Sequence, residues 1–309
     1  MNCSLVIRAY NEEKHLGRLL EGVRQQSVKD VEIILVDSGS TDKTVSIAES
    51  FGARIVRIEP VEFTFGRSLN LGLRAATQEL VVIASAHVYP VYPDWLECLL
   101  RPFDDKSVAL TYGKQRGPDT AYFSEQQIFH QWYPDTSQPR QAYPFCNNAN
   151  AAIRRSVWLS HPYDETLTGL EDLAWAKRVL EKGYALSYVA EAEIVHVHQE
   201  KPSGVFNRYR REAMAFKRIY PEAHFNVYDF ARLTTMNILS DLWHAAREKK
   251  LRESWGSIFW FRFMQFYGTL TGYRESGLLT PQLRETFYYA RARKPASNAR
   301  RDVEPIQYS

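Results

Sequence analysis

Four short apolar runs, separated by amphipathic segments, fill the first 85 residues and most constrain the fold. The runs cover residues 4–7, 31–36, 54–58 and 80–84. The second run is continuous and aliphatic, which is typical of a strand buried on both faces. Between the first two runs, apolar side chains recur at helical spacing at Leu16, Leu19, Leu20 and Val23. Strands that alternate with helices over short links predict a mostly parallel, doubly wound α/β sheet.

The same alternation continues, less regularly, to about residue 198. The pattern predicts a strand over residues 108–112, a helix that opens at 169–172, a strand over 184–189 and an extended segment over 194–198. Asn11 precedes the first amphipathic segment, so it is expected to cap that helix.

Polar clusters follow three of the predicted strands, at residues 8–13, 37–42 and 85–87. Ligands of open α/β sheets bind at the carboxyl ends of the strands, so these clusters are expected to share one site. The first turn lacks the GxGxxG pattern, which argues against a dinucleotide-binding oxidoreductase. Asp37 suits a ribose hydroxyl or a base N–H, but an acid there also suits an ordinary strand-to-helix turn.

The charge divides the chain. Residues 205–309 hold 18 Lys and Arg against 10 Asp and Glu, whereas residues 1–204 hold 21 against 26. We therefore expect a catalytic domain over 1–204 and a basic, aromatic helical extension with a polar tail over 205–309. Three scattered cysteines, no signal peptide and no apolar run of about 18 residues favour a cytoplasmic protein.

Four motifs resemble those of family 2 glycosyltransferases with the GT-A fold. They are VIRAYNEE (residues 6–13), IILVDSGSTD (33–42), Arg67 with Asn70, and the acidic motif GLEDLAW (169–175). The resemblance runs to about His198, two thirds of the chain. It implies a sugar-nucleotide donor site in which Ala9, Tyr10, Glu13 and Asp37 hold the nucleoside. Arg67 would reach the base or the diphosphate.

The chain departs from this family at the end of the fourth strand. The family usually has a DxD motif there, whose last acid binds a divalent metal, but this chain has Ser85, Ala86 and His87. The resemblance still implies Mn²⁺ or Mg²⁺ beneath the donor, with Ser85 and His87 at the donor and His87 as a ligand. Imidazole suits Mn²⁺ better than Mg²⁺. Polypeptide GalNAc-transferases use a DxH with a distant histidine, and His198, or else His196, resembles that partner. The alternative is that His87 only donates to the phosphates.

Glu171 and Asp172 open a predicted helix, where acids are favourable without any catalytic role. The resemblance implies instead that Asp172 is the general base of an inverting transfer and that Glu171 orients it or holds the acceptor. Asn148 and Asn150 would hold the acceptor, although an Asn-rich turn needs no ligand. Trp132 is expected either in a sugar platform or in the core.

The basic, aromatic extension leaves two alternatives. It suits a peripheral position on anionic lipid at the inner face of the cytoplasmic membrane, or packing on the catalytic domain or on a second subunit, as in a homo-oligomer. No nucleic-acid motif accompanies the charge, so nucleic acid is not an expected partner.

The resemblance is strongest to rhamnosyltransferase-like members with the same SAH and HxH features. It implies transfer from a nucleotide-diphosphate sugar, with UDP or dTDP, to a hydroxyl of a glycan or lipid-linked acceptor in bacterial surface polysaccharide synthesis. Two alternatives stay open. Ser85 permits a degenerate homologue that binds without catalysis. A nucleotidyltransferase would need a lysine in a Gly-rich first turn, and Lys14 lies too far into the helix.

Overall fold

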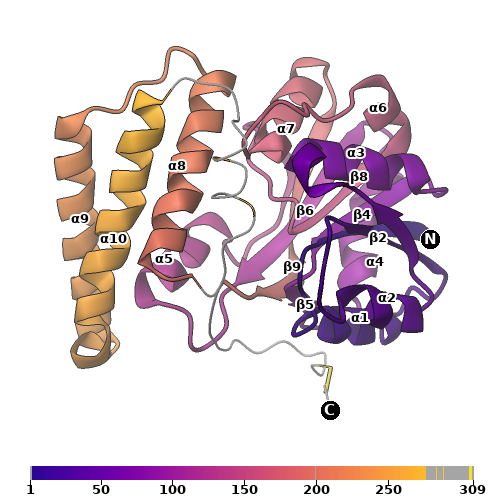
Figure 1. Cartoon of the computed structure of the whole chain (residues 1–309), viewed down its shortest axis with the longest axis horizontal. Helices are drawn as coiled ribbons and strands as arrows, with labels where there is room; N and C mark the ends of the chain where they lie inside the picture. The colour runs from indigo at the N-terminus through magenta and orange to yellow at the C-terminus, as the bar shows by residue number, and fades with distance from the viewer. Residues whose placement is uncertain (1, 199, 276–282, 284–287, 289–305, 308–309) are drawn as a thin grey trace.

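The computed structural model describes residues 2–198, 200–275, 283, 288 and 306–307. Figure 1 shows a sheet with helices on both faces and, at one end, three long helices side by side. This is the α/β sheet, covered by helices, that the alternation of strands and helices predicted, and the helical C-terminal region expected after residue 204 is also present.

The strands of the sheet are β1 (Cys3–Ala9), β2 (Val31–Asp37), β3 (Arg54–Arg57), β4 (Leu80–Ser85), β5 (Val88–Pro90), β6 (Val108–Arg116), β7 (Gln138–Gln141), β8 (Asn150–Arg154) and β9 (Ala185–His196). The helices are α1 (Leu16–Arg24), α2 (Thr44–Ser50), α3 (Phe65–Ala75), α4 (Trp95–Leu100), α5 (Phe123–Trp132), α6 (Arg155–Ser160), α7 (Glu171–Glu181), α8 (Pro202–Ile219), α9 (Val227–Arg247) and α10 (Leu251–Arg274). Two short 3₁₀ turns span Pro60–Glu62 and Arg101–Asp104.

The strand order is β3-β2-β1-β4-β8-β6-β9-β5, and β7 pairs with β9. The first four strands are parallel, as predicted, and β6 is parallel to β9. The sequence pattern did not predict that β8 runs antiparallel between β4 and β6. In the parallel half, Ala9 pairs with Asp37 and Arg8 pairs with Ser85. The predicted polar clusters therefore begin at one edge of the sheet.

Alternating side chains divide the core between the two faces of the sheet. On β1, Leu5 and Ile7 pack with α1, whereas Val6 packs with α3. Helix α3 lies so close to the sheet that a Cβ on Gly72 would come within 2.4 Å of Val6 Cγ1. This close approach carries α3 across the sheet and requires glycine at that position.

Asn11 does not cap α1, which begins only at Leu16. The residue has a φ of 50°, and its Oδ1 atom accepts hydrogen bonds from the backbone N–H groups of Thr41 (2.7 Å) and Asp42 (3.3 Å). The prediction was wrong because Asn also tolerates left-handed backbone and binds neighbouring backbone in loops. Asn11 instead ties the loop after β1 to the loop after β2.

The helices after residue 200 pack tightly on one another and on α5. Helix α10 lies between α8 and α9 (Figure 1), and Arg262 on α10 forms a buried two-bond ion pair with Asp241 on α9. The proposed boundary at residue 204 falls inside the first turn of α8, which begins at Pro202. None of the helices in the described residues is both long and apolar enough to cross a bilayer.

Much of the positive charge of α8 is used inside the protein. Arg210 pairs with Glu275, Lys217 donates to the Tyr273 carbonyl, and Arg218 donates to the Thr166 carbonyl. Basic side chains that the sequence suggested as an outer surface therefore largely hold α8 to other parts of the same chain.

Candidate active site

A cavity of about 370 Å³ opens at the carboxyl ends of β1 and β4. Its walls come from the loops that follow these strands, from the start of α7, from the end of β9 and from α8. The candidate residues named from the sequence that line it are Ala9, Tyr10, Ser85, His87, Trp132, Asn148, Glu171, Asp172, His196 and His198. Segments from residues 8 to 212, together with Tyr288, thus converge on one chamber.

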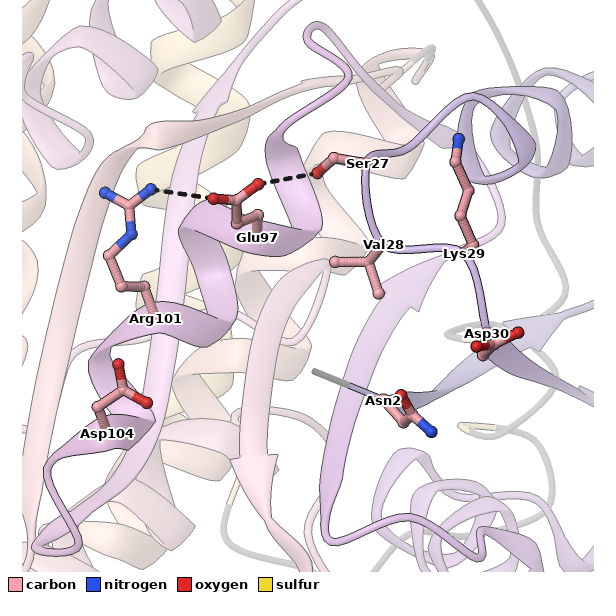
Figure 2. Close-up of a pocket in the computed structure, with 8 residues that line it drawn as sticks. All are labelled: Asn2, Ser27, Val28, Lys29, Asp30, Glu97, Arg101 and Asp104. Carbon is pink, nitrogen blue, oxygen red and sulfur yellow. Dashed lines mark hydrogen bonds and ion pairs between the residues drawn. The ribbon is translucent and has the colours of Figure 1, made fainter.

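A second hollow lies at the opposite ends of the strands. Figure 2 shows Asn2 and Asp30, which precede β1 and β2, together with Glu97 of α4 and Arg101 at its end. Glu97 accepts from the Ser27 hydroxyl at 3.0 Å and pairs with Arg101 at 3.5 Å. Because ligands of such sheets bind at the carboxyl ends of the strands, this hollow is not the candidate site.

Asp37 and Glu13 do not line the cavity. Asp37 is 3% exposed, and its carboxylate accepts from the backbone N–H groups of Gly39 and Ser40 at 3.2 and 3.1 Å. Glu13 accepts from the Lys43 N–H at 3.2 Å. Both acids therefore shape the loop that follows β2, whose Ser38 does line the cavity.

Arg67 and Asn150 also lie outside the cavity lining. Arg67 pairs with Glu62 at 2.8 Å and with Glu165 at 3.5 Å. Asn150 is fully buried, accepts from the Trp95 indole at 2.8 Å, and donates to the carbonyls of Lys114 and Ala192. Its amide is used within the protein, which is a structural role.

The acidic pair is held at the start of α7. Leu170 precedes the helix with a φ of 53°. Asp172 Oδ2 accepts from the Asn148 N–H at 3.1 Å and Oδ1 accepts from the Leu173 N–H at 2.8 Å. Burial, and then the charge of Glu171, raise the pKa of Asp172 to about 7. A carboxylate with such a pKa suits a general base at neutral pH.

Three arginine side chains also reach the cavity: Arg8 belongs to the predicted polar cluster at residues 8–13, whereas the two arginines of α8 were not predicted there. Arg8 pairs with Glu171 at 3.0 Å, and its guanidinium lies 4.6 Å from the centre of the Phe65 ring. Arg211 of α8 lies 4.9 Å from the same ring. Arg208, one turn earlier, pairs with Glu125 and Glu200, each at 2.8 Å. The interleaving of arginine and aromatic residues in this stretch was the available signal, but it did not show which way the side chains point.

His87, His196 and His198 form a cluster in the cavity, with one nitrogen from each within 4.8 Å of the other two. The sequence left His196 and His198 as alternatives, whereas the structure brings both together with His87. Burial lowers the pKa values of His196 and His198 well below their usual range, and nearby His198 and Arg208, respectively, add to the shift. Both imidazoles are therefore neutral at pH 7, as metal ligands must be.

Each histidine of the cluster has its Nδ1 atom beside a side-chain oxygen. The partners are Glu12 Oε1 at 3.1 Å from His87, Gln115 Oε1 at 2.8 Å from His196 and Glu125 Oε1 at 2.9 Å from His198. The Nε2 atom of His196 is buried and has no hydrogen-bond partner among the described residues.

Trp132 lies at the rim of the cavity with 45% of its surface exposed, while Phe129 on the same helix is buried. Phe129 therefore belongs to the core, whereas the exposed side of Trp132 can face a ligand, as the sugar-platform alternative requires. Tyr133 is buried.

The family model described as glycosyl transferase family 2 matches residues 4–158. The chain belongs to this family. The match covers half of the family 2 glycosyltransferase chain and includes the loops after β1, β2 and β4. The acidic pair, both histidines near the end of β9 and the arginines of α8 lie beyond it.

Two similar curated proteins are O-antigen chain rhamnosyltransferases. This family 2 chain is 29% identical over 226 residues to WbaN of Salmonella anatum, covering 67% of this chain and 69% of that protein. It is 27% identical to RfbN of Salmonella typhimurium, covering 68% and 70%. Among solved structures, the mannosyltransferase PcManGT of Pyrobaculum calidifontis, in complex with GDP-Man and Mn²⁺, superimposes with a TM-score of 0.62. That likeness covers 87% of this chain and 86% of the other at 17% identity, so it shows the fold alone.

Proposed function

We propose that this family 2 glycosyltransferase inverts the anomeric centre as it moves a sugar from a nucleotide-diphosphate donor to an acceptor hydroxyl. The observation that carries the proposal is Asp172, a buried carboxylate in the cavity wall with a pKa raised to about 7. Asp172 takes the hydroxyl proton as the acceptor oxygen bonds to the anomeric carbon. The bond from that carbon to the diphosphate breaks, and the diphosphate leaves with the electron pair.

The donor would enter at the ends of β1 and β4. Ala9, Tyr10 and Ser85 line that part of the cavity and would contact the nucleoside and the diphosphate. Glu13 and Asp37 would act on the nucleoside through the loop that they hold. The rhamnosyltransferase relatives favour a deoxyhexose donor carried on dTDP, with UDP as the alternative nucleotide carrier.

The charge of the cavity favours a divalent metal in the donor complex. Six acids and three arginines line it: Glu12, Glu125, Glu171, Asp172, Glu200 and Glu212, with Arg8, Arg208 and Arg211. An anionic diphosphate would meet net negative charge there, so a dication held by His87 and His198 would help it to bind. Such an ion supplies positive charge to the leaving diphosphate. The resemblance to family 2 glycosyltransferases implied either Mn²⁺ or Mg²⁺ as this ion.

The acceptor would lie over the acidic pair. Asn148 receives the Tyr163 hydroxyl hydrogen bond at 3.3 Å and lies beside both acids. Trp132 offers an exposed ring at the rim on which a sugar can stack. The O-antigen relatives favour a glycan or lipid-linked acceptor in surface polysaccharide synthesis.

A panel of sugar nucleotides, each with and without Mn²⁺, tests the donor proposal by thermal shift and by product release. We expect a dTDP- or UDP-sugar to raise the melting temperature and to release its nucleoside diphosphate when an acceptor glycan is added. Binding without release for every donor and acceptor pair would favour the degenerate homologue. Transfer of a nucleotidyl group would indicate a nucleotidyltransferase.

We also propose that the turn between α9 and α10 (lower left in Figure 1) contacts anionic lipid at the inner face of the cytoplasmic membrane. Trp243 and Trp255 flank this turn and are 55% and 60% exposed. Arg247 lies over the Trp243 ring at 4.6 Å, and Lys249, Lys250 and Arg252 follow it in exposed positions. Exposed indoles beside cations suit the headgroup region of anionic lipid.

Co-sedimentation with vesicles tests this position. We expect binding to vesicles that contain phosphatidylglycerol, weak binding to pure phosphatidylcholine, and loss of binding in a Trp243→Ser, Trp255→Ser double variant. Tyr228→Ser, at the far end of α9 where this side chain is 72% exposed, is the matched control. Equal retention of all proteins by both vesicles, or by neither, would contradict the proposal.

A further inference from the structure

We propose that His87, His196 and His198 bind one transition-metal dication through their Nε2 atoms before any donor arrives, and that Mg²⁺ is a poor occupant. The inference rests on the proposed function only for the role of the ion, because occupancy can be measured without turnover. It adds a third ligand, a ligand geometry and a metal class to the divalent ion already considered.

The hydrogen bonds on the far side of each ring carry the first step. The carboxylate oxygen of Glu12 and the amide oxygen of Gln115 can only accept, so the facing Nδ1 atoms of His87 and His196 carry the protons. The Nδ1 atom of His198 faces Glu125 in the same way and also lies beside Arg208. A neutral imidazole protonated on Nδ1 has its lone pair on Nε2. One ring nitrogen of each histidine lies within 4.8 Å of one from each of the other two, and the rings come from β9, from the segment just after it and from the loop after β4. Metal-binding histidines usually have this kind of outer partner.

The Nε2 atom of His196 also points to a bound metal. His196 is only 5% exposed, and its Nε2 atom has no hydrogen-bond partner in the described part of the chain. Buried polar atoms nearly always have a partner, so each exception needs a reason. A metal ion bound at Nε2 would supply the partner.

Arg208 joins the cluster to the C-terminal helices. It pairs with Glu125 at 2.8 Å, which holds that carboxylate against His198. Its Nη1 atom also lies 2.9 Å from His198 Nδ1, and an arginine can only donate. That contact suits the other neutral form of His198, with the proton on Nε2. The two forms differ by the position of one proton, and metal binding would select the form that donates to Glu125.

The ligand set selects the metal. Three neutral nitrogens suit Mn²⁺, Co²⁺ and Zn²⁺, with affinity rising toward Zn²⁺, whereas Mg²⁺ prefers oxygen ligands. Three protein ligands also leave a coordination position free, as catalytic zinc sites do. Two nitrogens bound to one ion lie about 3.4 Å apart, so metal binding would draw the three rings closer than the 4.8 Å within which their nitrogens lie.

Titration of the chelator-treated full-length protein with Co²⁺, Mn²⁺, Zn²⁺ and Mg²⁺, without any nucleotide, tests the inference by calorimetry and by the visible absorption of bound Co²⁺. We expect one Co²⁺ or Zn²⁺ per chain, weaker Mn²⁺ binding and no saturable Mg²⁺ binding. His196→Ala and the more exposed His87→Ala should each lose at least tenfold in Co²⁺ affinity. Glu125→Gln should lose about tenfold to a hundredfold, the usual effect of changing an outer partner.

His130→Ala, an exposed histidine on α5 that does not line the cavity, is the matched control and should bind normally. His87→Ala keeps the test decisive if the buried His196→Ala fails to fold. Binding only when donor is present, equal affinity for Mg²⁺, or wild-type affinity in folded His87→Ala would overturn the inference. Metal binding without sugar transfer would leave this site standing and contradict the proposed function. Sugar transfer by a protein that shows no saturable Co²⁺ or Zn²⁺ binding would do the reverse.

Discussion

The backbone N–H of Asn148 donates to the Asp172 carboxylate at 3.1 Å. This bond joins the segment before β8 to the first turn of α7, two parts of the chain that are 24 residues apart. The bond fixes the orientation of the Asp172 carboxylate, the proposed base, while burial and Glu171 raise the pKa of Asp172. The site thus combines a rigid carboxylate with a proton affinity suited to neutral pH.

The first prediction concerns the pH dependence of transfer. The pKa of Asp172 is raised to about 7, so the base is protonated and inactive below that pH. We expect kcat/KM for the acceptor to rise about tenfold per pH unit below 7 and to level off above it. A pH profile that is flat between 5 and 8 would contradict the role of Asp172.

Arg8 should tune that profile. Its positive charge lowers the pKa of Asp172, against the larger effects of burial and Glu171, and it pairs with Glu171 at 3.0 Å. We expect Arg8→Met to move the acid limb of kcat/KM to higher pH, and Arg8→Lys to restore most of the original position. A merely structural role would lower the rate at every pH without moving the limb.

The ionised Asp172 carboxylate should lower the free energy of unfolding at high pH. A folded-state pKa above the unfolded value of 3.8 means that the native protein disfavours the charged acid, so the cost grows as pH rises from about 4 to 7. We expect Asp172→Asn to raise the melting temperature by a few degrees at pH 8 and by less at pH 5. Scanning calorimetry at both pH values measures the difference, and an equal shift at both would refute the linkage.

Two glycines in helices should respond in opposite ways to alanine. A Cβ on Gly72 would lie 2.4 Å from Val6 Cγ1, whereas one on Gly256 meets nothing within 4 Å. We expect Gly72→Ala to lower the free energy of unfolding by about 1–3 kcal/mol through overpacking. Gly256→Ala should raise it by about 0.5–1 kcal/mol through helix propensity. Urea denaturation of both variants checks the contrast.

Sequence patterns predicted the parallel half of the sheet because its strands are continuous apolar runs that end in polar clusters. Parallel register then brings Arg8 level with Ser85 and Ala9 level with Asp37. The antiparallel insertion of β8 was not predictable in this way, because an apolar run carries no mark of its direction.

The parts of the site that the sequence missed depend on tertiary packing. Whether Arg208 and Arg211 face the cavity depends on how α8 lies against the catalytic domain, and local charge does not encode that. His196 and His198 could be placed on one face by their spacing, but their joint position with His87 depends on the pairing of β5 with β9. Asn150 looked like a ligand because buried and exposed asparagines have the same sequence signature.

The most direct test of the account is a single-turnover assay of Asp172→Asn with the donor and acceptor found by the panel. We predict that donor affinity, measured by calorimetry, stays within about twofold of wild type while the transfer rate falls at least a thousandfold, the scale of a lost general base. Glu181→Gln, an acid at the exposed far end of the same helix, should transfer at the wild-type rate. An Asp172→Asn enzyme that transfers sugar at the wild-type rate would contradict the central claim.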